Sequence, residues 1–143
     1  MEKKVRKENP KKLYLQQVKL CRIKTEIAQS ELEHIRAKVN TVQAIRYDKE
    51  RTMTSPPTGS EVEELAVMLT DQKAKYLEAL MTYQKKRDEV VGKINLIEDP
   101  RYSAILYARY IEERPWSEIS RKLGYAGSHV RHLHGDALQA FKI

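Results

Sequence analysis

Apolar residues recur along residues 11–50 at alternating steps of four and three, which is the spacing of a coiled-coil seam. Leu13, Leu20, Ile23 and Ile27 lie beside this seam and widen the apolar face in the first half of the predicted helix. A seam between two helices does not need that width. The pattern therefore predicts a further contact, either with a second subunit or with the C-terminal part of the same chain. The seam positions are Tyr14, Val18, Cys21, Thr25, Ala28, Leu32, Ile35, Val39, Val42 and Arg46.

A second helix with the same sevenfold repeat follows a break near residues 52–60. The run Ser55-Pro56-Pro57-Thr58-Gly59 ends any helix, and Ser60 is the predicted N-cap of the next one. Lys86 and Lys93 at seam positions indicate that the seam weakens toward the C-terminal end. Two helices of similar length joined by a short loop predict an antiparallel hairpin over residues 11–98. The repeat positions are Val62, Leu69, Tyr76, Tyr83, Val90 and Ile97.

The last 28 residues have the pattern of two short helices that meet at a tight turn. Gly124 lies where the turn needs a positive φ, and Ser120 is small where two crossing helices approach closely. Asp99-Pro100 marks the start of this unit, because the residue before a proline disfavours helix. The spacing predicts a helix-turn-helix within residues 99–143 of an all-α protein. The apolar edges are Ile119 and Leu123 on the first helix, and Val130, Leu133 and Ala137 on the second.

The net charge of +7 is concentrated at the two ends of the chain. Residues 1–12 hold six basic and two acidic side chains, residues 13–100 hold fourteen of each, and residues 101–143 hold seven and four. This distribution is typical of a phosphate-binding surface with a neutral spacer, although ordinary solubility charge is the alternative. Residues 1–10 are predicted to be a flexible tail that attracts DNA phosphates through Lys3, Lys4, Arg6 and Lys7.

The second helix of the motif holds most of the candidate DNA-binding residues. Arg131 is the best candidate for reading a base, because an arginine can donate two hydrogen bonds to guanine. Ser128 is also a candidate cap for a helix that Gly127 weakens at its start. His129, His132 and His134 cluster, but only Asp136 stands beside them at ligand spacing, so DNA contact is favoured over metal binding. The predicted DNA-binding set is Arg121, Lys122, Gly127, Ser128, His129, Arg131 and His132.

Nothing in the sequence indicates an enzyme or a cofactor. It has no glycine-rich phosphate loop, no nucleophile elbow and no paired acidic residues in an apolar setting. The single Cys21 excludes an intramolecular disulfide and suits a reducing cytosol, and no apolar run approaches the length of a membrane span. We therefore expect a cytoplasmic protein.

From Pro100 to Phe141 the chain resembles region 4 of bacterial sigma factors without a gap. With its long helical segment in front, the chain as a whole is similar to the sigma-region-4-like regulators of Gram-positive phages and prophages. These include activators of late genes and autolysin regulators. The matching points are Leu106, Arg109-Tyr110, Trp116 to Ser120, Leu123-Gly124, Val130-Arg131, Leu133 and Ala137-Leu138.

The chain departs from the sigma pattern at the residues that read the promoter. Sigma factors typically place Arg-Glu-Arg ahead of the apolar residue found here at Val130, and Gln two residues after it. This chain has Gly127, Ser128, His129 and His132 at the corresponding positions. In this stretch, only Arg131 is of the residue type that sigma factors have. The resemblance thus implies the fold and the entry of a helix into the major groove, and not the standard promoter sequence.

These observations favour a sequence-specific transcriptional regulator of phage or prophage late genes. It is expected to bind double-stranded DNA as a homodimer through Leu20, Ile23 and Ile27, and RNA polymerase is a further candidate partner. The alternative is a small terminase subunit that recognises viral DNA for packaging; a ring of eight or more subunits would indicate that class. A coiled-coil adaptor whose helix-turn-helix binds only protein is a third hypothesis, which the charge of the tail and motif disfavours.

Overall fold

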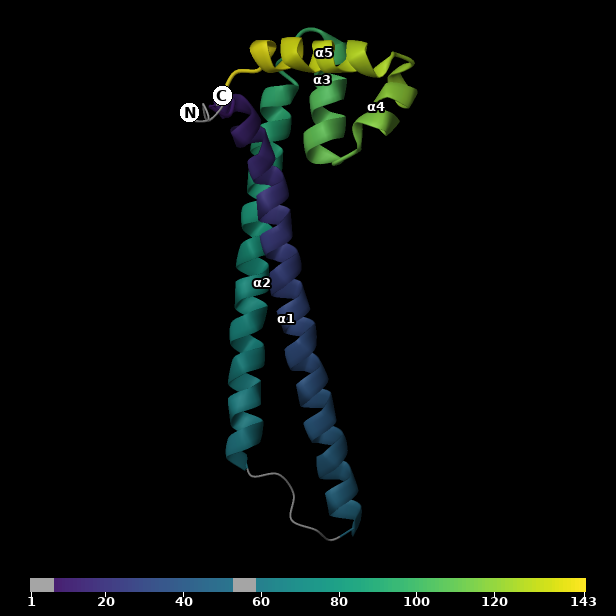
Figure 1. The fold of residues 1–143 in the computed structure, drawn as a ribbon. Helices are drawn as coiled ribbons and strands as arrows, with labels where there is room; N and C mark the ends of the chain where they lie inside the picture. Colours follow the sequence, from purple (N-terminus) through teal and green to yellow (C-terminus); the bar gives the residue numbers. More distant parts are fainter. Residues whose placement is uncertain (1–6, 53–58) are drawn as a thin grey trace, which may run out of the picture. The chain divides into compact units, whose positions relative to one another are not determined.

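The computed structural model describes residues 7–52 and 59–143, and all regular structure in them is helical, as predicted (Figure 1). The chain divides into two compact units. We call Arg22–Thr82 the hairpin unit, and Met1–Cys21 with Tyr83–Ile143 the head unit. No described helix has both the length and the apolarity needed to cross a membrane. The elements are α1 (Pro10–Thr52), α2 (Gly59–Ile94), α3 (Pro100–Leu106), the π-helical turn η1 (Tyr107–Ile111), α4 (Trp116–Leu123) and α5 (Gly127–Ala140).

In the hairpin unit, α1 and α2 run antiparallel (Figure 1). Leu32 and Ile35 of α1 are buried there. Two polar side chains at seam positions form hydrogen bonds to the backbone of the other helix. The hydroxyl of Thr25 donates to the carbonyl of Ala79 at 3.1 Å, and Nε2 of Gln72 donates to the carbonyl of Ala28 at 3.1 Å. These hydrogen bonds let polar side chains occupy seam positions without the cost of an unpaired buried group.

The start of α2 differs by one residue from the prediction. The helix begins at Gly59, so Ser60 lies in its first turn rather than at the N-cap. Glu61 stands in that first turn, where a carboxylate interacts favourably with the positive end of the helix dipole. The proline pair of the predicted break, Pro56-Pro57, lies outside the described residues.

The head unit has a core to which the ends of both long helices contribute. Leu15 and Val18 of α1 and Val90 and Ile94 of α2 are buried in one cluster with residues of the C-terminal helices. At this end of α2, where the sequence predicted a weaker seam, α3, η1 and α5 supply additional apolar partners. The remaining members of this cluster are Leu106, Tyr110, Ala137, Leu138 and Phe141.

The two lysines that suggested a weak seam pack around an aromatic ring. The Nζ atoms of Lys86 and Lys93 lie 5.4 and 4.7 Å from the ring centroid of Tyr14. Their aliphatic stems can cover apolar surface while the ammonium groups stay near water and the ring face. The Tyr14 hydroxyl also donates to the carboxylate of Glu89, and this hydrogen bond is the main cause that lowers the pKa of Glu89.

The wide apolar face of α1 is only partly used inside the chain. The C-terminal helices pack on Leu15, which the seam pattern missed, and on Val18. Leu20 and Ile27 remain 56% and 60% exposed. The C-terminal helices thus contact α1 at Leu15 and Val18, outside the predicted wide face, and leave Leu20 and Ile27 uncovered.

The predicted boundary at Asp99-Pro100 is the start of α3. Asp99 is the N-cap, and its side chain accepts a hydrogen bond from the backbone N–H of Arg101 at 2.9 Å. The hydroxyl of Ser103 donates to the carbonyls of Ile94 and Ile97 at 3.2 and 3.4 Å. It thereby satisfies acceptors at the end of α2 and joins the end of that helix to α3.

Candidate nucleic-acid interface

The helix-turn-helix is built on a small core between α3, η1, α4 and α5. Ile105, Ala108, Ile119, Val130 and Leu133 are buried together in it. Ile119, Val130 and Leu133 are the edges that the sequence predicted. Because one side of α4 and of α5 packs into this core, the opposite side of each short helix faces solvent.

The turn between α4 and α5 depends on Gly124 and Ser120. Gly124 has φ = 72°, which glycine adopts without steric cost, and its N–H donates to the carbonyl of Ser120 at 3.0 Å. The hydroxyl of Ser120 donates to the carbonyl of Tyr125. These contacts stabilise the turn that leads into α5, and the positive φ at Gly124 is the one that the sequence predicted.

The start of α5 has no side-chain cap. The helix begins at Gly127 with Ala126 at the N-cap, so the prediction that Ser128 caps a later start is wrong. Gly127 accommodates the earlier start, and Ser128 lies inside the first turn with an exposed side chain. The first backbone N–H groups of a helix lack partners within it, and together with the dipole they favour an anion.

Every residue of the predicted DNA-binding set is exposed. Arg121 and Lys122 lie in the last turn of α4. The other five lie in the first half of α5: Gly127, Ser128, His129, Arg131 and His132. The fold therefore leaves all of them accessible to a ligand, next to the uncapped start of α5.

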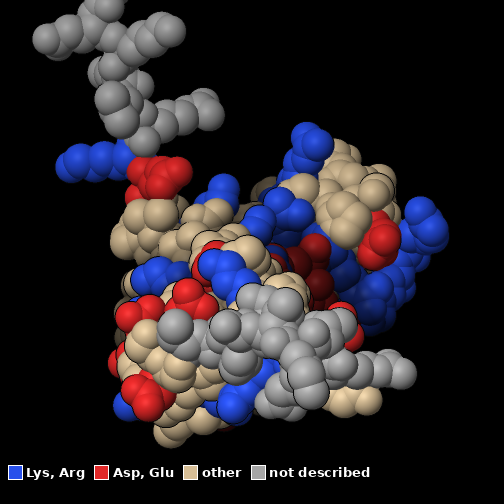
Figure 2. Space-filling view, turned by 90° about the horizontal axis from the view of Figure 1, so that it is seen from below, with Lys and Arg blue, Asp and Glu red and all other residues tan. Residues whose placement is uncertain are grey.

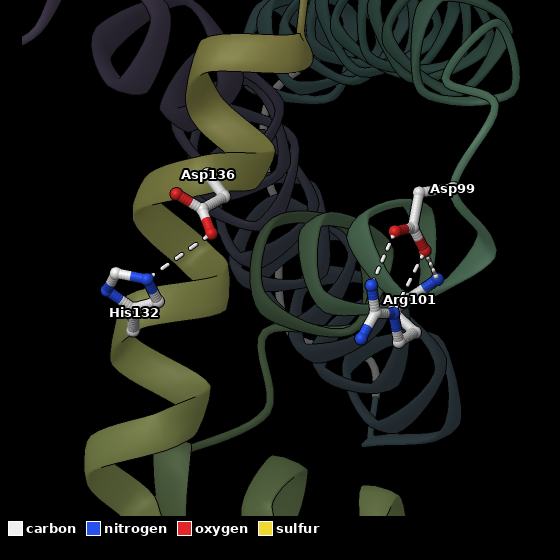
Figure 3. Close-up of polar contacts among 4 residues, drawn as sticks. All are labelled: Asp99, Arg101, His132 and Asp136. Atoms are coloured by element: carbon white, nitrogen blue, oxygen red, sulfur yellow. Dashed lines mark hydrogen bonds and ion pairs between the residues drawn. The ribbon is translucent and has the colours of Figure 1, made fainter.

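The arginines of this region fall into two groups. Arg121 and Arg131 form no ion pair or side-chain hydrogen bond with any described residue. Three others are held by partners in the head unit. Arg101 binds Asp99 through Nη2 and Oδ2 at 2.8 Å, as Figure 3 shows, and these contacts lower the pKa of the Asp99 carboxyl.

The other two held arginines lie near the turn before α4. Arg114 binds Oε2 of Glu112 at 2.9 Å through Nη2, and Nη1 lies 3.6 Å from Oε2 of Glu118. Arg109 donates from Nη1 to the carbonyl of Arg114 at 3.2 Å, and its guanidinium lies 4.6 Å from the ring centroid of Trp116. These side chains stabilise the domain, whereas Arg121 and Arg131 are free to bind an anion.

Two of the three clustered histidines lie at the surface of α5. The ring of His129 meets that of Tyr125 edge-on at 4.8 Å between centroids. Nε2 of His132 lies 3.6 Å from Oδ2 of Asp136, one turn further along the helix (Figure 3). Among the described residues, no three metal-binding side chains converge.

The third histidine, His134, is half-buried against the core and is not an exposed contact as the cluster had suggested. It shares the buried face of α5 with Val130 and Ala137, and its ring meets Trp116 edge-on at 4.7 Å. Burial, with further contributions from the charges of Lys12 and Arg109, lowers its pKa to about 4. The i, i+4 spacing from Val130 was the sequence signal that could have assigned it to the core.

The start of α1 lies beside the end of α5. Lys7 is exposed, whereas Lys3, Lys4 and Arg6 lie outside the described residues. Nζ of Lys11 donates to the carbonyl of Gln139 near the end of α5 at 3.1 Å. The chain therefore enters the fold within the head unit, which also contains the helix-turn-helix. Over the hairpin, by contrast, Figure 2 shows acidic and basic side chains interspersed.

Residues 99–142, just under a third of the chain, match a protein family described as Sigma-70, region 4. This match agrees with the resemblance inferred from the sequence and with the helix-turn-helix observed in the structure. The C-terminal part of the chain is thus a sigma-region-4-like helix-turn-helix. No curated protein and no solved structure matches the chain.

Proposed function

We propose that this protein is a sequence-specific DNA-binding transcriptional regulator whose α5 enters the major groove. The observation that carries the proposal is the division of the arginines. Arg121 and Arg131 are exposed and unpaired among the described residues, whereas Arg101, Arg109 and Arg114 are held within the head unit. Unpaired cations beside the start of α5 fit the phosphates and base edges of a DNA groove.

Different residues of this surface have different roles in the proposal. The uncapped N–H groups at the start of α5, with Arg121 and Lys122 from α4, bind phosphates and set the position of the domain. Arg131 donates to O6 and N7 of a guanine. Ser128, His129 and His132 contact neighbouring base edges or phosphates, and Gly127 allows the backbone close to the DNA. Lys3, Lys4, Arg6 and Lys7 add attraction that does not depend on sequence.

The resemblance to phage and prophage regulators supports a proposal for the biological role. We propose control of late genes in the cytoplasm of a bacterial host, at operators that differ from the standard promoter sequence. The difference is expected because Gly127, Ser128, His129 and His132 replace the sigma residues that read that sequence. Packaging of viral DNA by a small terminase subunit has no comparable support in the residues of the motif.

We further propose that the protein acts as a homodimer. Leu20 and Ile27 are exposed on α1 and Ile23 is half-buried beside them, so the predicted interface is accessible to a second copy. A two-fold dimer presents two recognition helices and reads paired half-sites at a separation fixed by the protein.

A contact with RNA polymerase is also proposed, through an apolar groove of about 380 Å³ in the head unit. Its lining includes Ile94, Tyr107, Ile119 and Leu123, with Lys122 beside them. A protein partner held there would lie next to the end of α4. Ala104 also lines this groove and is exposed, so Ala104→Gln should fill part of the groove and weaken polymerase recruitment in a pull-down while DNA affinity is retained.

Selection of binding sites from random DNA, followed by footprinting, tests the proposed function. We expect one enriched, inverted-repeat motif that the protein protects. Equal binding to all sequences would contradict sequence-specific regulation, and the absence of DNA binding at low salt would contradict the proposal as a whole.

A further inference from the structure

The exposed apolar residues of α1 form a stripe with coiled-coil spacing. Leu13, Leu20 and Ile27 follow one another at intervals of seven and are 44%, 56% and 60% exposed. Leu20 and Ile27 each lie two positions after a seam residue, which places them roughly 200° around the helix from the seam. Ile23, half-buried, lies between them. The stripe is therefore a second face of α1 that the antiparallel α2 does not cover.

We propose that a second copy of the chain covers this face, with the two α1 helices running antiparallel. The proposal rests on the homodimer of the proposed function and adds the direction of the helices and the residues that fix it. A two-fold contact places the same surface of both copies together, so the face has to be complementary to itself. The charged residues that flank the stripe decide which direction meets that condition.

A parallel pair would place like charges together. If the stripes of two copies packed as a parallel coiled coil, the residue before a stripe position such as Leu20 would face the residue five places further along the partner helix. Lys19 would face Lys24 of the partner subunit, and Glu26 would face Glu31 of the partner subunit. All four side chains are exposed on α1, and by symmetry each repulsion would occur twice. This arrangement is unfavourable on both flanks of the stripe.

An antiparallel pair places opposite charges together. When Leu20 packs against Ile23 of the partner subunit, Lys19 lies beside Glu26 of the partner subunit, and the symmetric contact doubles the attraction. Lys24 then faces Gln17 of the partner subunit, so this flank holds no like-charge pair. Glu26 is already bound by Arg22 of its own chain, but a carboxylate has acceptor sites for a further donor.

The antiparallel arrangement also spaces the two head units. Its two-fold axis passes between Leu20 and Ile23, whereas Leu15 is the α1 residue buried in the head-unit core. The two copies of Leu15 are then about 20 Å apart along the helix direction, from a rise of about 1.5 Å per residue. A parallel pair would place them at the same level. The proposed contact thus sets two recognition helices apart as an inverted pair.

Charge reversal distinguishes the two directions because it changes dimer affinity in opposite senses. In the antiparallel dimer, Lys19→Glu faces Glu26 of the partner subunit and should weaken dimerisation by about 3- to 30-fold, since two exposed pairs are inverted. Adding Glu26→Lys should restore the affinity. Lys24→Glu is the matched control, with the same charge change on the same helix, and should alter the affinity less than about twofold. Sedimentation equilibrium without DNA measures each dissociation constant, and circular dichroism checks that each variant stays helical.

A tighter dimer for Lys19→Glu or for Lys24→Glu would overturn the antiparallel arrangement in favour of a parallel one. A wild-type protein that stays monomeric at micromolar concentration, or a Lys19→Glu variant with unchanged affinity, would overturn the α1 contact itself. Because no DNA is present in this measurement, these outcomes are separate from any failure of the proposed DNA binding.

Discussion

The hydroxyl of Tyr110 lies 2.8 Å from Nε2 of His134, and this contact joins η1 to α5 inside the head unit. Burial raises the pKa of Tyr110 to about 12, so the hydroxyl keeps its proton at neutral pH. We assign the hydrogen of this contact to the hydroxyl, which donates to an uncharged imidazole. His134 is therefore a neutral, half-buried residue that holds α5 against η1, while His129 and His132 lie on the exposed side of α5.

The stability of the protein should fall as the pH decreases from 6.5 toward 4. The pKa of His134 is about 4 in the folded protein against an ordinary value of 6.5, so between these values the unfolded chain binds more protons. Protonation would also place a positive ring beside Lys12 and Arg109. Thermal melts across this range should show a steeper loss for the wild type than for His134→Gln, which does not titrate. Parallel curves for the two proteins would contradict the lowered pKa of His134.

The ends of the long helices should be needed for the stability of the C-terminal helices. Leu15→Ala removes a fully buried side chain from the shared core and should lower the free energy of unfolding by about 2–5 kcal/mol. Leu96→Ala, at a residue that is 81% exposed, is the matched control and should cost less than about 0.5 kcal/mol. Urea unfolding followed by Trp116 fluorescence measures both. Similar losses for the two variants would mean that Leu15 is not part of this core.

Deleting residues 1–8 should weaken binding to all DNA sequences and make the salt dependence shallower. The deletion removes Lys3, Lys4, Arg6 and Lys7, and each phosphate contact contributes about 0.9 to the slope of log affinity against log salt. The shortened protein retains Asn9, whose side chain accepts a hydrogen bond from the backbone N–H of Lys11 at the start of α1. Fluorescence anisotropy at several salt concentrations gives the slope. If the slope does not change, the tail does not contact DNA.

The sequence predicted those parts of the fold that local rules control. The positive φ at Gly124 and the break at Asp99-Pro100 each depend on a few neighbouring residues, and each is present in the structure. Seam residues that the heptad spacing predicted, such as Leu32 and Ile35, are buried. The prediction from the sequence failed where the contacts join residues that are far apart along the chain. Leu15 is buried and the Val90–Ile94 end of α2 is covered because α3, η1 and α5 pack on them, and periodicity along one helix cannot show this.

The candidate interface was predictable to a similar extent. Exposure of Arg131 and His132 follows from their place opposite the apolar edge of α5. The division between held and free arginines was not predictable, because it depends on ion pairs such as Arg114 with Glu112 and on the stacking of Arg109 over Trp116. The three histidines lie within six residues of one another, and only the three-dimensional packing separates His134 from the other two.

The central claim is that α5 reads DNA sequence through Arg131, and the most direct test is the affinity of Arg131→Ala for the selected site and for a scrambled duplex. We predict that the specific affinity falls by about 1–3 kcal/mol, with a smaller loss on the scrambled duplex and relaxed preference at one base pair. Arg36→Ala, which removes the same charge from an exposed position of the hairpin unit, should change neither affinity measurably. An equal loss on both duplexes would make Arg131 a phosphate contact, and an unchanged affinity on the specific site would contradict the account.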